Sequence, residues 1–298
     1  MKLTADRTDI VVPGSIVGFG TGYSILAAAI IPADHVNVRA VAGAAQVSGL
    51  GLGAKAPDPT RHPTVVALRS LLDHVGAPQV GVHLAFRSKI LRGSGLGSFE
   101  AEVIAGLVAA TRMLGSPDAL DEEFLLDFAE KLGADRLRAM VSLGGGAALR
   151  VGSEHLRNLP VDPNSGLEIT AFVPSFTLDE RSDQDAEPRA IRYSQAQRSA
   201  ASLALQLGLL AGTTAITPGV LMDATENAMR AEQLSVRSPA STSLVTWFRD
   251  QQIPAFVCGS GPSVICYGSV PEAIGDAAVQ SGWSQLPLGL TVSGALTT

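Results

Sequence analysis

The chain has 298 residues, of which 46% are hydrophobic and 17% are charged, a balance typical of a globular protein with a sizeable core. Its net charge is −6 at pH 7 and no Lys/Arg-rich run occurs, so we expect no nucleic-acid partner. No stretch has the length and apolarity of a membrane span or a leader peptide, so we expect a cytoplasmic protein without a membrane partner. The two cysteines are expected to be reduced, and the five histidines lack metal-ligand spacing.

In chain order, hydrophobic periodicity predicts alternating strands and helices. Up to residue 132, strands are expected over 9–12, 36–42 and 79–86, and helices over 64–75, 98–114 and 120–132. Beyond it, strands are expected over 147–151 and 167–173, helices over 195–210, 218–233 and 241–251, and a strand–turn–strand over 255–267. The acidic segment 178–192 is interpreted as an exposed loop. The expected fold class is therefore α+β, with glycine-rich turns between elements.

A glycine-rich loop directly precedes the clearest predicted helix, 98–114. Small residues let backbone N–H groups approach an anion, and the helix dipole adds partial positive charge. The members of this predicted anion-binding loop are Gly93, Ser94, Gly95, Leu96, Gly97 and Ser98. A second glycine run, 49–53, is followed by Pro57 and cannot open a helix, so we predict a turn without a ligand.

Three glycine-rich segments match one protein family together and in order. Residues 12–23 read VPGSIVGFGTGY, residues 91–98 read LRGSGLGS and residues 255–263 read AFVCGSGPS. These segments resemble the three motifs of the GHMP superfamily of small-molecule kinases, and within it the homoserine kinases. The resemblance implies a two-lobed α+β fold, with a ligand cleft between an N-terminal lobe over 1–160 and a C-terminal lobe over 161–298. It also implies a small-molecule substrate, ATP and Mg²⁺ as cofactors, and a homodimer.

The resemblance also assigns roles to single residues. Glu130 corresponds to the metal-binding glutamate of the family, with Asp135 as its acidic neighbour and Ser98 as the loop residue beside the metal. Together with Glu100, the carboxylates of Glu130 and Asp135 are the predicted catalytic groups. The positions implied for substrate binding are Ser15, Gly18, Ser24, Gly259, Ser260 and Gly261.

Several of these positions differ from the family pattern. Gly18 stands where the family has asparagine, and Ser24 stands where it has the aspartate that meets the substrate hydroxyl. In the loop, Phe99 replaces a second serine and Glu100 replaces a small residue. A carboxylate about 4 Å from a phosphate charge costs on the order of 4 kcal/mol at an effective dielectric constant of about 20, unless a cation such as Lys89 compensates. Alternatively, Glu100 only favours the helix N-terminus and points to solvent.

Three functions remain open from the sequence. The first is a repurposed enzyme acting on a small anionic or amino-acid-like metabolite, with Glu100 or Glu130 doing acid–base work and no nucleotide cofactor. The second is an ATP-dependent kinase that phosphorylates a small-molecule hydroxyl. The third is a non-catalytic pseudo-kinase that keeps the cleft as a binding site. Because substrate-side and metal-side positions are replaced together, we expect the first function and not homoserine phosphorylation itself.

Overall fold

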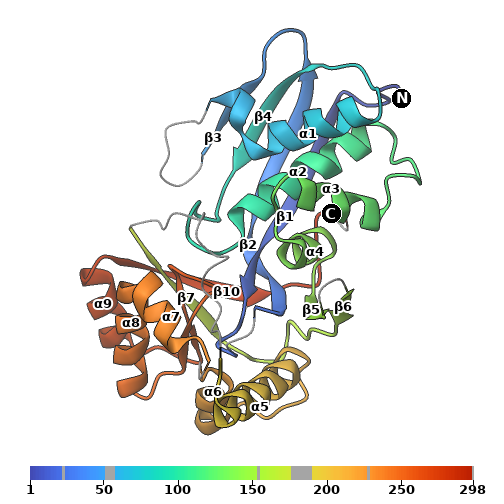
Figure 1. Cartoon of the computed structure of the whole chain (residues 1–298). Coiled ribbons are helices and arrows are strands. Elements are labelled where there is room, and N and C mark those ends of the chain that lie inside the picture. Colours follow the sequence, from blue (N-terminus) through green and yellow to red (C-terminus); the bar gives the residue numbers. More distant parts are fainter. Residues whose placement is uncertain (22–23, 51–57, 153–154, 176–189, 227–228, 297–298) are drawn as a thin grey trace.

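The computed structural model describes residues 1–21, 24–50, 58–152, 155–175, 190–226 and 229–296, which form the predicted α+β fold (Figure 1). The strands before residue 160 are β1 (Arg7–Val17), β2 (Leu26–Val41), β3 (Gln46–Leu50), β4 (Gly81–Arg87), β5 (Ala147–Val151) and β6 (His155–Leu159). Those after it are β7 (Ile169–Pro174), β8 (Ala255–Val257), β9 (Val264–Tyr267) and β10 (Trp283–Leu290). The sheet order is β3-β4-β2-β10-β7-β9-β8, with β1 and β5 also paired to β2.

The long strand β2 connects most of this sheet. It pairs antiparallel with the whole of β1, with a register shift between Pro13 and Gly14. Its C-terminal half also pairs with β4, its first residues pair with β5, and Ile30 and Ile31 pair with β10. Because β10 also pairs with β7, strands from both halves of the chain form one continuous sheet. The lobe boundary at residue 160 stays a prediction.

Helices cover the strands in two groups. The first comprises α1 (Pro63–His74), α2 (Ser98–Met113), α3 (Glu122–Lys131) and α4 (Arg136–Gly144), preceded by the short 3₁₀ turn η1 (Pro59–Arg61). The second comprises α5 (Tyr193–Leu210), α6 (Pro218–Ala224), α7 (Ala231–Arg237), α8 (Pro239–Asp250) and α9 (Glu272–Gln280). Figure 1 shows α1 and α2 side by side over the N-terminal strands. None of the helices described combines the length and apolarity needed to cross a membrane.

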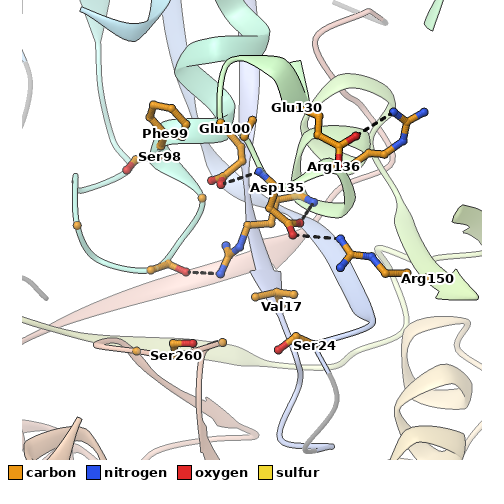
Figure 2. Close-up of a pocket in the computed structure, with 18 of the residues that line it drawn as sticks. Val17, Ser24, Ser98, Phe99, Glu100, Glu130, Asp135, Arg136, Arg150 and Ser260 are labelled. Carbon is orange, nitrogen blue, oxygen red and sulfur yellow. Dashed lines mark hydrogen bonds and ion pairs between the residues drawn. The ribbon is translucent and has the colours of Figure 1, made fainter. Parts of the chain in front are cut away.

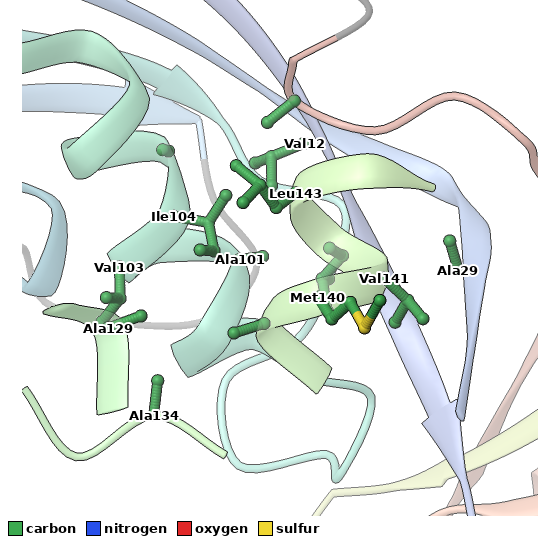
Figure 3. Packing of buried hydrophobic residues seen from close by; sticks show 14 of the residues in the cluster. Val12, Ala29, Ala101, Val103, Ile104, Ala129, Ala134, Met140, Val141 and Leu143 are labelled. Atoms are coloured by element: carbon green, nitrogen blue, oxygen red, sulfur yellow. The ribbon is translucent and has the colours of Figure 1, made fainter. Parts of the chain in front are cut away.

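Two hydrophobic clusters hold these layers together. The larger one joins β1, β2, α2 and α4, where side chains such as Val12, Ile104 and Leu143 meet (Figure 3). The smaller one lies between β7 and α8, where the ring centroids of Phe172 and Phe248 are 4.7 Å apart. Full burial of such a side chain stabilises the fold by about 1.5–3 kcal/mol. The larger cluster places the end of β1 and the beginnings of α2 and α4 close together.

Most predicted elements are confirmed with small shifts at their ends, although β1 and β2 extend well beyond the strands predicted over 9–12 and 36–42. The predicted helices over 64–75, 98–114 and 195–210 are α1, α2 and α5. The single helix predicted over 218–233 is wrong, because α6 ends at Ala224 and α7 begins only at Ala231. The strand predicted over 9–12 continues to Val17, since β1 absorbs Pro13 and Gly14 by shifting its register.

Other elements went unpredicted or lie outside the described residues. Sequence periodicity missed α4, α9, β6 and β10. The α4 segment escaped because it opens with charged side chains, Arg136 and Arg138, on both sides of Leu137. The predicted loop over 178–192 lies almost wholly outside the described residues. Of the predicted turn over 49–53, residues 49–50 end β3 and the rest lie outside the described residues.

Gly106 lies where α2 packs against α1. A Cβ here would overlap the carbonyl oxygen of Thr64 and lie 2.8 Å from the Cβ of Ala67. Because these helices cannot separate without opening the core, we expect Gly106→Ala to lower the free energy of unfolding by about 1–3 kcal/mol in chemical denaturation. Gly219→Ala in α6 is the matched control, since its Cβ would meet nothing within 4 Å. That change should be neutral or stabilising by up to about 1 kcal/mol, and equal effects would contradict the packing argument.

Candidate functional site

A cleft of about 730 Å³ lies between the glycine loop before α2, the beginning of α4 and the turn after β8 (Figure 2). It is lined by residues of all three glycine-rich segments. The predicted site residues in its lining are Ser24, Gly93, Gly95, Gly97, Ser98, Glu100, Glu130, Asp135, Gly259, Ser260 and Gly261. The predicted site residues that do not line it are Ser15, Gly18, Ser94 and Leu96. The sequence motifs therefore converge on one cavity, while the role of each residue stays a prediction.

The loop over 93–98 has a backbone that favours glycine. Gly93, Gly95 and Gly97 have φ angles of +70°, +79° and +75°. A Cβ on Gly95 would overlap the carbonyl oxygen of Gly261, and one on Gly97 would overlap Ser15 Oγ. Gly97 is the N-cap of α2 and supplies no side-chain cap. The first-turn N–H groups of α2 therefore face the cleft side without a cap and suit an anion.

Ser94 and Leu96 support this loop from inside. Both are almost fully buried. The Ser94 hydroxyl donates to the carbonyl oxygen of Leu91 at 2.6 Å and accepts from the Leu96 N–H at 3.3 Å. The Leu96 carbonyl oxygen accepts from the N–H of Ser15 at 2.9 Å, which ties the loop to β1. Contact with a bound anion would therefore fall to the glycines and Ser98.

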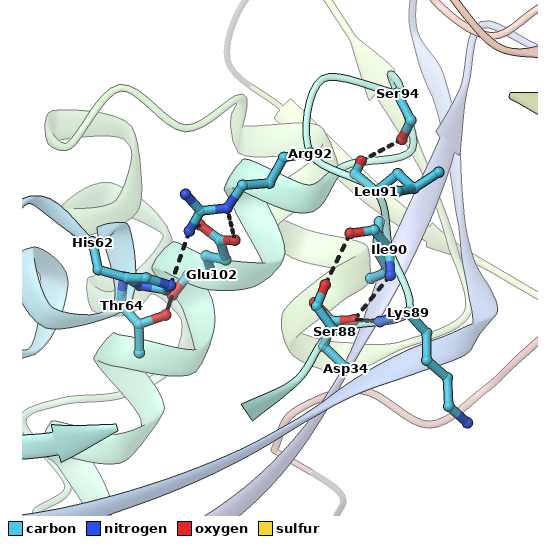
Figure 4. Close-up of polar contacts among 10 residues, drawn as sticks. All are labelled: Asp34, His62, Thr64, Ser88, Lys89, Ile90, Leu91, Arg92, Ser94 and Glu102. Atoms are coloured by element: carbon cyan, nitrogen blue, oxygen red, sulfur yellow. Dashed lines mark hydrogen bonds and ion pairs between the residues drawn. The ribbon is translucent and has the colours of Figure 1, made fainter. Parts of the chain in front are cut away.

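An ion pair behind the loop joins its beginning to α2 (Figure 4). Arg92 Nε and Nη2 donate to the two carboxylate oxygens of Glu102, each at 2.7 Å. Arg92 Nη2 also lies 2.9 Å from Nε2 of His62. Burial, and then the charge of Arg92, lower the pKa of His62 to about 4, so this imidazole is neutral at pH 7. Because both oxygens of Glu102 accept from the guanidinium, the pair fixes the orientation of Arg92 as well as its distance from α2.

Asp34 holds the turn that leads from β4 into the loop (Figure 4). Its carboxylate accepts from the N–H groups of Lys89 at 2.6 Å and Ile90 at 3.0 Å, and from the Ser88 hydroxyl at 3.1 Å. Burial raises the pKa of Asp34 despite these hydrogen bonds. The Lys89 side chain lines a separate pocket on the outer face of the sheet. It therefore does not supply the compensating charge for Glu100 that the sequence suggested.

The first glycine-rich segment ends beside the cleft. Ser15 is fully buried, and its Oγ accepts from Arg138 Nη1 at 3.1 Å. Gly18 donates its N–H to the main chain of β2 at 2.9 Å and so closes the turn after β1. Ser24 is exposed to the cleft, and its Oγ accepts from Arg230 Nη1 at 2.8 Å. Of these three predicted substrate positions, Ser24 alone lines the cavity.

The Glu100 side chain lies in the cleft and points toward the beginning of α4 (Figure 2). Its Oε1 accepts from the N–H of Asp135 at 3.5 Å. Burial raises the pKa of Glu100, while the charge of Arg138 and two backbone N–H groups act in the opposite direction. Glu100 therefore does not simply point to solvent. Phe99 beside it both lines the cleft and packs on the main hydrophobic cluster.

The other two predicted catalytic carboxylates are engaged by arginines. Glu130 is 61% exposed, and its Oε2 lies 3.4 Å from Arg136 Nη1. Asp135 caps α4 by accepting from the N–H of Arg138 at 2.9 Å, and it pairs with Arg150 at 3.1 Å. Within the described ranges, no three His, Cys, Asp or Glu side chains gather as metal ligands. The described carboxylates therefore do not fit a metal site formed by the protein alone.

Sequence reasoning missed the cations of the cleft. The arginines in its lining are Arg136, Arg138, Arg150 and Arg237. Arg136 contacts Glu123, Asp127 and Glu130, so one edge of the cleft is an ion-pair network. Arg136 and Arg138 lie in the first turn of α4, where positive charges oppose the helix dipole and need an electrostatic reason, but the sequence did not predict α4. That reason became visible only when α4 was placed against the glycine loop.

Because the pKa of Glu100 is raised, the thermal stability of the protein should depend on pH. Because the folded protein holds this proton more tightly than the unfolded chain, the contribution of Glu100 is fully present below its ordinary pKa of 4.5 and is lost as pH rises through the folded-state value. Glu100→Gln cannot ionise and so avoids this loss. The melting temperature of the variant minus that of wild type should therefore increase between pH 4 and pH 8, by roughly a few degrees. Thermal unfolding across this range measures it. Glu130→Gln, at an exposed carboxylate, should show no such rise.

The chain has relatives of known name in sequence. No model of a protein family matches the sequence. The homoserine kinase of Streptomyces coelicolor is 29% identical over 288 residues, covering 95% of this chain and 92% of that protein. The homoserine kinase of Clavibacter michiganensis is 25% identical over 303 residues, covering 98% of this chain and 94% of that protein. The likeness in sequence thus runs through both halves of the chain.

Solved structures give the same fold. A homoserine kinase from Cytophaga hutchinsonii superposes with a TM-score of 0.75 at 22% identity, covering 98% of this chain and 97% of that one. A mevalonate kinase from Methanococcus jannaschii superposes with a TM-score of 0.60 at 13% identity, covering 96% and 99%. The chain therefore has the fold of the GHMP kinases and resembles homoserine kinases over nearly its whole length.

Proposed function

We propose that this chain is an enzyme that acts on a small anionic, amino-acid-like metabolite in the cleft, with Glu100 transferring a proton and without a nucleotide. The observation that carries this proposal is the position of Glu100, half-buried in the cleft beside the N-terminus of α2. A carboxylate at this position repels the phosphates that such a loop would otherwise bind. It is also well placed to exchange a proton with a smaller ligand.

Two properties of the cleft support acid–base work. A carboxyl group whose pKa is raised keeps its proton closer to neutral pH and can donate it, and Glu100 has this property through burial. The beginning of α2, which has no side-chain N-cap, offers positive potential to a carboxylate of the ligand. A substrate with an anionic group and an exchangeable proton suits both properties, as an amino acid does.

The relatives are named homoserine kinases, so L-homoserine and its O-phosphate ester are the first substrates to test. We expect NMR in D₂O, without nucleotide, to detect deuterium incorporation or a new product. Glu100→Gln should lower the rate by roughly 10²–10⁴-fold, because it removes the transferred proton. Substrate affinity should not fall, because the variant loses a negative charge beside an anionic ligand. Glu123→Gln, an exposed carboxylate outside the cleft lining, serves as the control. A strict requirement for ATP with every accepted substrate would reject the proposal.

An ATP-dependent kinase acting on a small-molecule hydroxyl is the second candidate. It is favoured by the glycine loop, whose three positive φ angles and uncapped helix suit a phosphate group. Under this alternative, ATP and Mg²⁺ would be the cofactors, and the metal would enter with the nucleotide phosphates. The names of the relatives agree with such an activity. A homodimer and a cytoplasmic location stay predictions under either candidate.

Glu100→Ala separates the two candidates by nucleotide binding. If the carboxylate repels phosphate, removing it should increase the affinity for Mg²⁺ and a non-hydrolysable ATP analogue by about tenfold or more. Calorimetric titration measures both proteins, with Glu123→Ala, which removes an exposed carboxylate outside the cleft lining, as the control. Binding of the analogue by wild type with a Kd near 100 μM, about −5.5 kcal/mol, would favour the kinase. Ligand binding without product in either assay would indicate a non-catalytic protein.

A further inference from the structure

A single guanidinium touches all three glycine-rich segments. Arg138, in the first turn of α4, donates from Nη1 to the carbonyl oxygen and to Oγ of Ser15, each at 3.1 Å. Its Nη2 donates to the carbonyl oxygen of Gly95 at 3.1 Å. A Cβ on Gly259 would lie 3.1 Å from the same Nη2. Arg138 thus contacts the end of β1, the loop before α2 and the turn after β8.

The buried first turn of a helix is an electrostatically unfavourable position for a cation. The N-terminus of a helix repels positive charge, and burial opposes the charged form of Arg138. Cys258, which also hydrogen-bonds to the guanidinium, and then Glu100 and Asp135 outweigh this burial, so the pKa of Arg138 is raised. The planar fork of an arginine can reach two separated acceptors at once, which the single ammonium of lysine cannot do with the same geometry. The arrangement therefore uses the shape of the guanidinium as well as its charge.

The bond to Gly95 also sets the direction of the loop peptides. In a planar trans peptide, the C=O and N–H groups point in opposite directions. The Gly95 carbonyl is held toward Arg138, and the next carbonyl, that of Leu96, is held toward the N–H of Ser15. The N–H of Gly97, which shares a peptide with the Leu96 carbonyl, is therefore turned away from β1. The Arg138 bond fixes the Gly95 peptide, whose Leu96 N–H donates to Ser94 Oγ inside the loop, while the bond to Ser15 fixes the peptide of the Gly97 N–H. Arg138 also holds Ser15, so it supports both peptides.

We propose that Arg138 is a positioning residue that holds the three glycine-rich segments at the spacing and peptide orientation needed to bind a small oxyanion. The proposal rests on the proposed function only for the anionic nature of the ligand. It does not require Glu100 to transfer a proton. Arg138 acts through Ser15 and Gly95, and its effect on the ligand is carried by the loop.

Inorganic pyrophosphate is the probe, titrated calorimetrically into ¹⁵N-glycine-labelled protein that carries Glu100→Gln, so that the Glu100 carboxylate does not repel it. Arg138→Lys keeps the charge and removes the fork, while Arg138→Met removes both. We expect each to weaken pyrophosphate binding by about tenfold or more, equivalent to about 1.4 kcal/mol. Both variants should also shift the amide signals of Gly95, Gly97 and Gly259. Arg150→Met is the matched control, because Arg150 lines the same cleft but is paired with Asp135.

The control should lose less than about threefold in affinity, as expected for a partly exposed charge, and should leave the three glycine signals in place. Equal losses of pyrophosphate affinity in Arg138→Lys and Arg150→Met would overturn the proposal, since the hydrogen bonds of Arg138 would then have no special effect on binding. Unchanged affinity with unmoved glycine signals on adding Arg138→Lys, or no pyrophosphate binding by the Glu100→Gln parent at millimolar concentration, would also overturn it. If Arg138→Met does not fold, Arg138→Lys decides. Loss of pyrophosphate binding in Arg138→Lys, with no nucleotide-free turnover by wild type, would reject only the proposed function.

Discussion

The cleft depends on the close approach of three glycine-rich backbone segments around the side chains of Ser15 and Arg138. Gly95 meets the carbonyl of Gly261, and Gly97 meets Ser15, at separations that leave no room for a Cβ. The N–H of Gly259 donates to the carbonyl of Val17 at 2.9 Å, which closes the third contact. Since β1, α2 and β8 each run into one of these contacts, their ends are brought to a common point. The cavity is the space that remains beside that point.

The carboxylates of the cleft differ in their partners. Glu102 and Asp135 each form an ion pair with an arginine, and Arg136 contacts Glu130. Glu100, in contrast, has backbone N–H groups as its hydrogen-bond donors in the described part of the chain, and its charge is opposed by burial. Burial therefore favours the protonated form of Glu100 and raises its pKa. This difference in partners distinguishes Glu100 from the other carboxylates of the cleft.

The sequence predicted those parts of the site that have a local signature. Glycines before a strongly periodic helix indicate an anion-binding loop, and both the φ angles and the position of α2 agree with that signature. The contacts of Arg138 with Ser15, and of Arg92 with His62, join residues far apart in the chain, so no local pattern encodes them. Likewise, the break between α6 and α7 depends on packing that periodicity does not register. What could be predicted was the set of segments, and what could not was their side-chain partners.

The central place of β10 has a consequence for how the chain is made. Gly289 pairs with Ile31, and the N–H of Ala295 donates to the carbonyl of Ser142 at 3.0 Å, so late residues complete structure begun by early ones. Contacts so distant in sequence slow folding, because a long loop must close before they form. On the ribosome, the edge of β2 at Ile31 stays unpaired until residue 289 has emerged. During synthesis the nascent protein thus exposes an open β edge, the kind of surface on which chains aggregate and which chaperones shield.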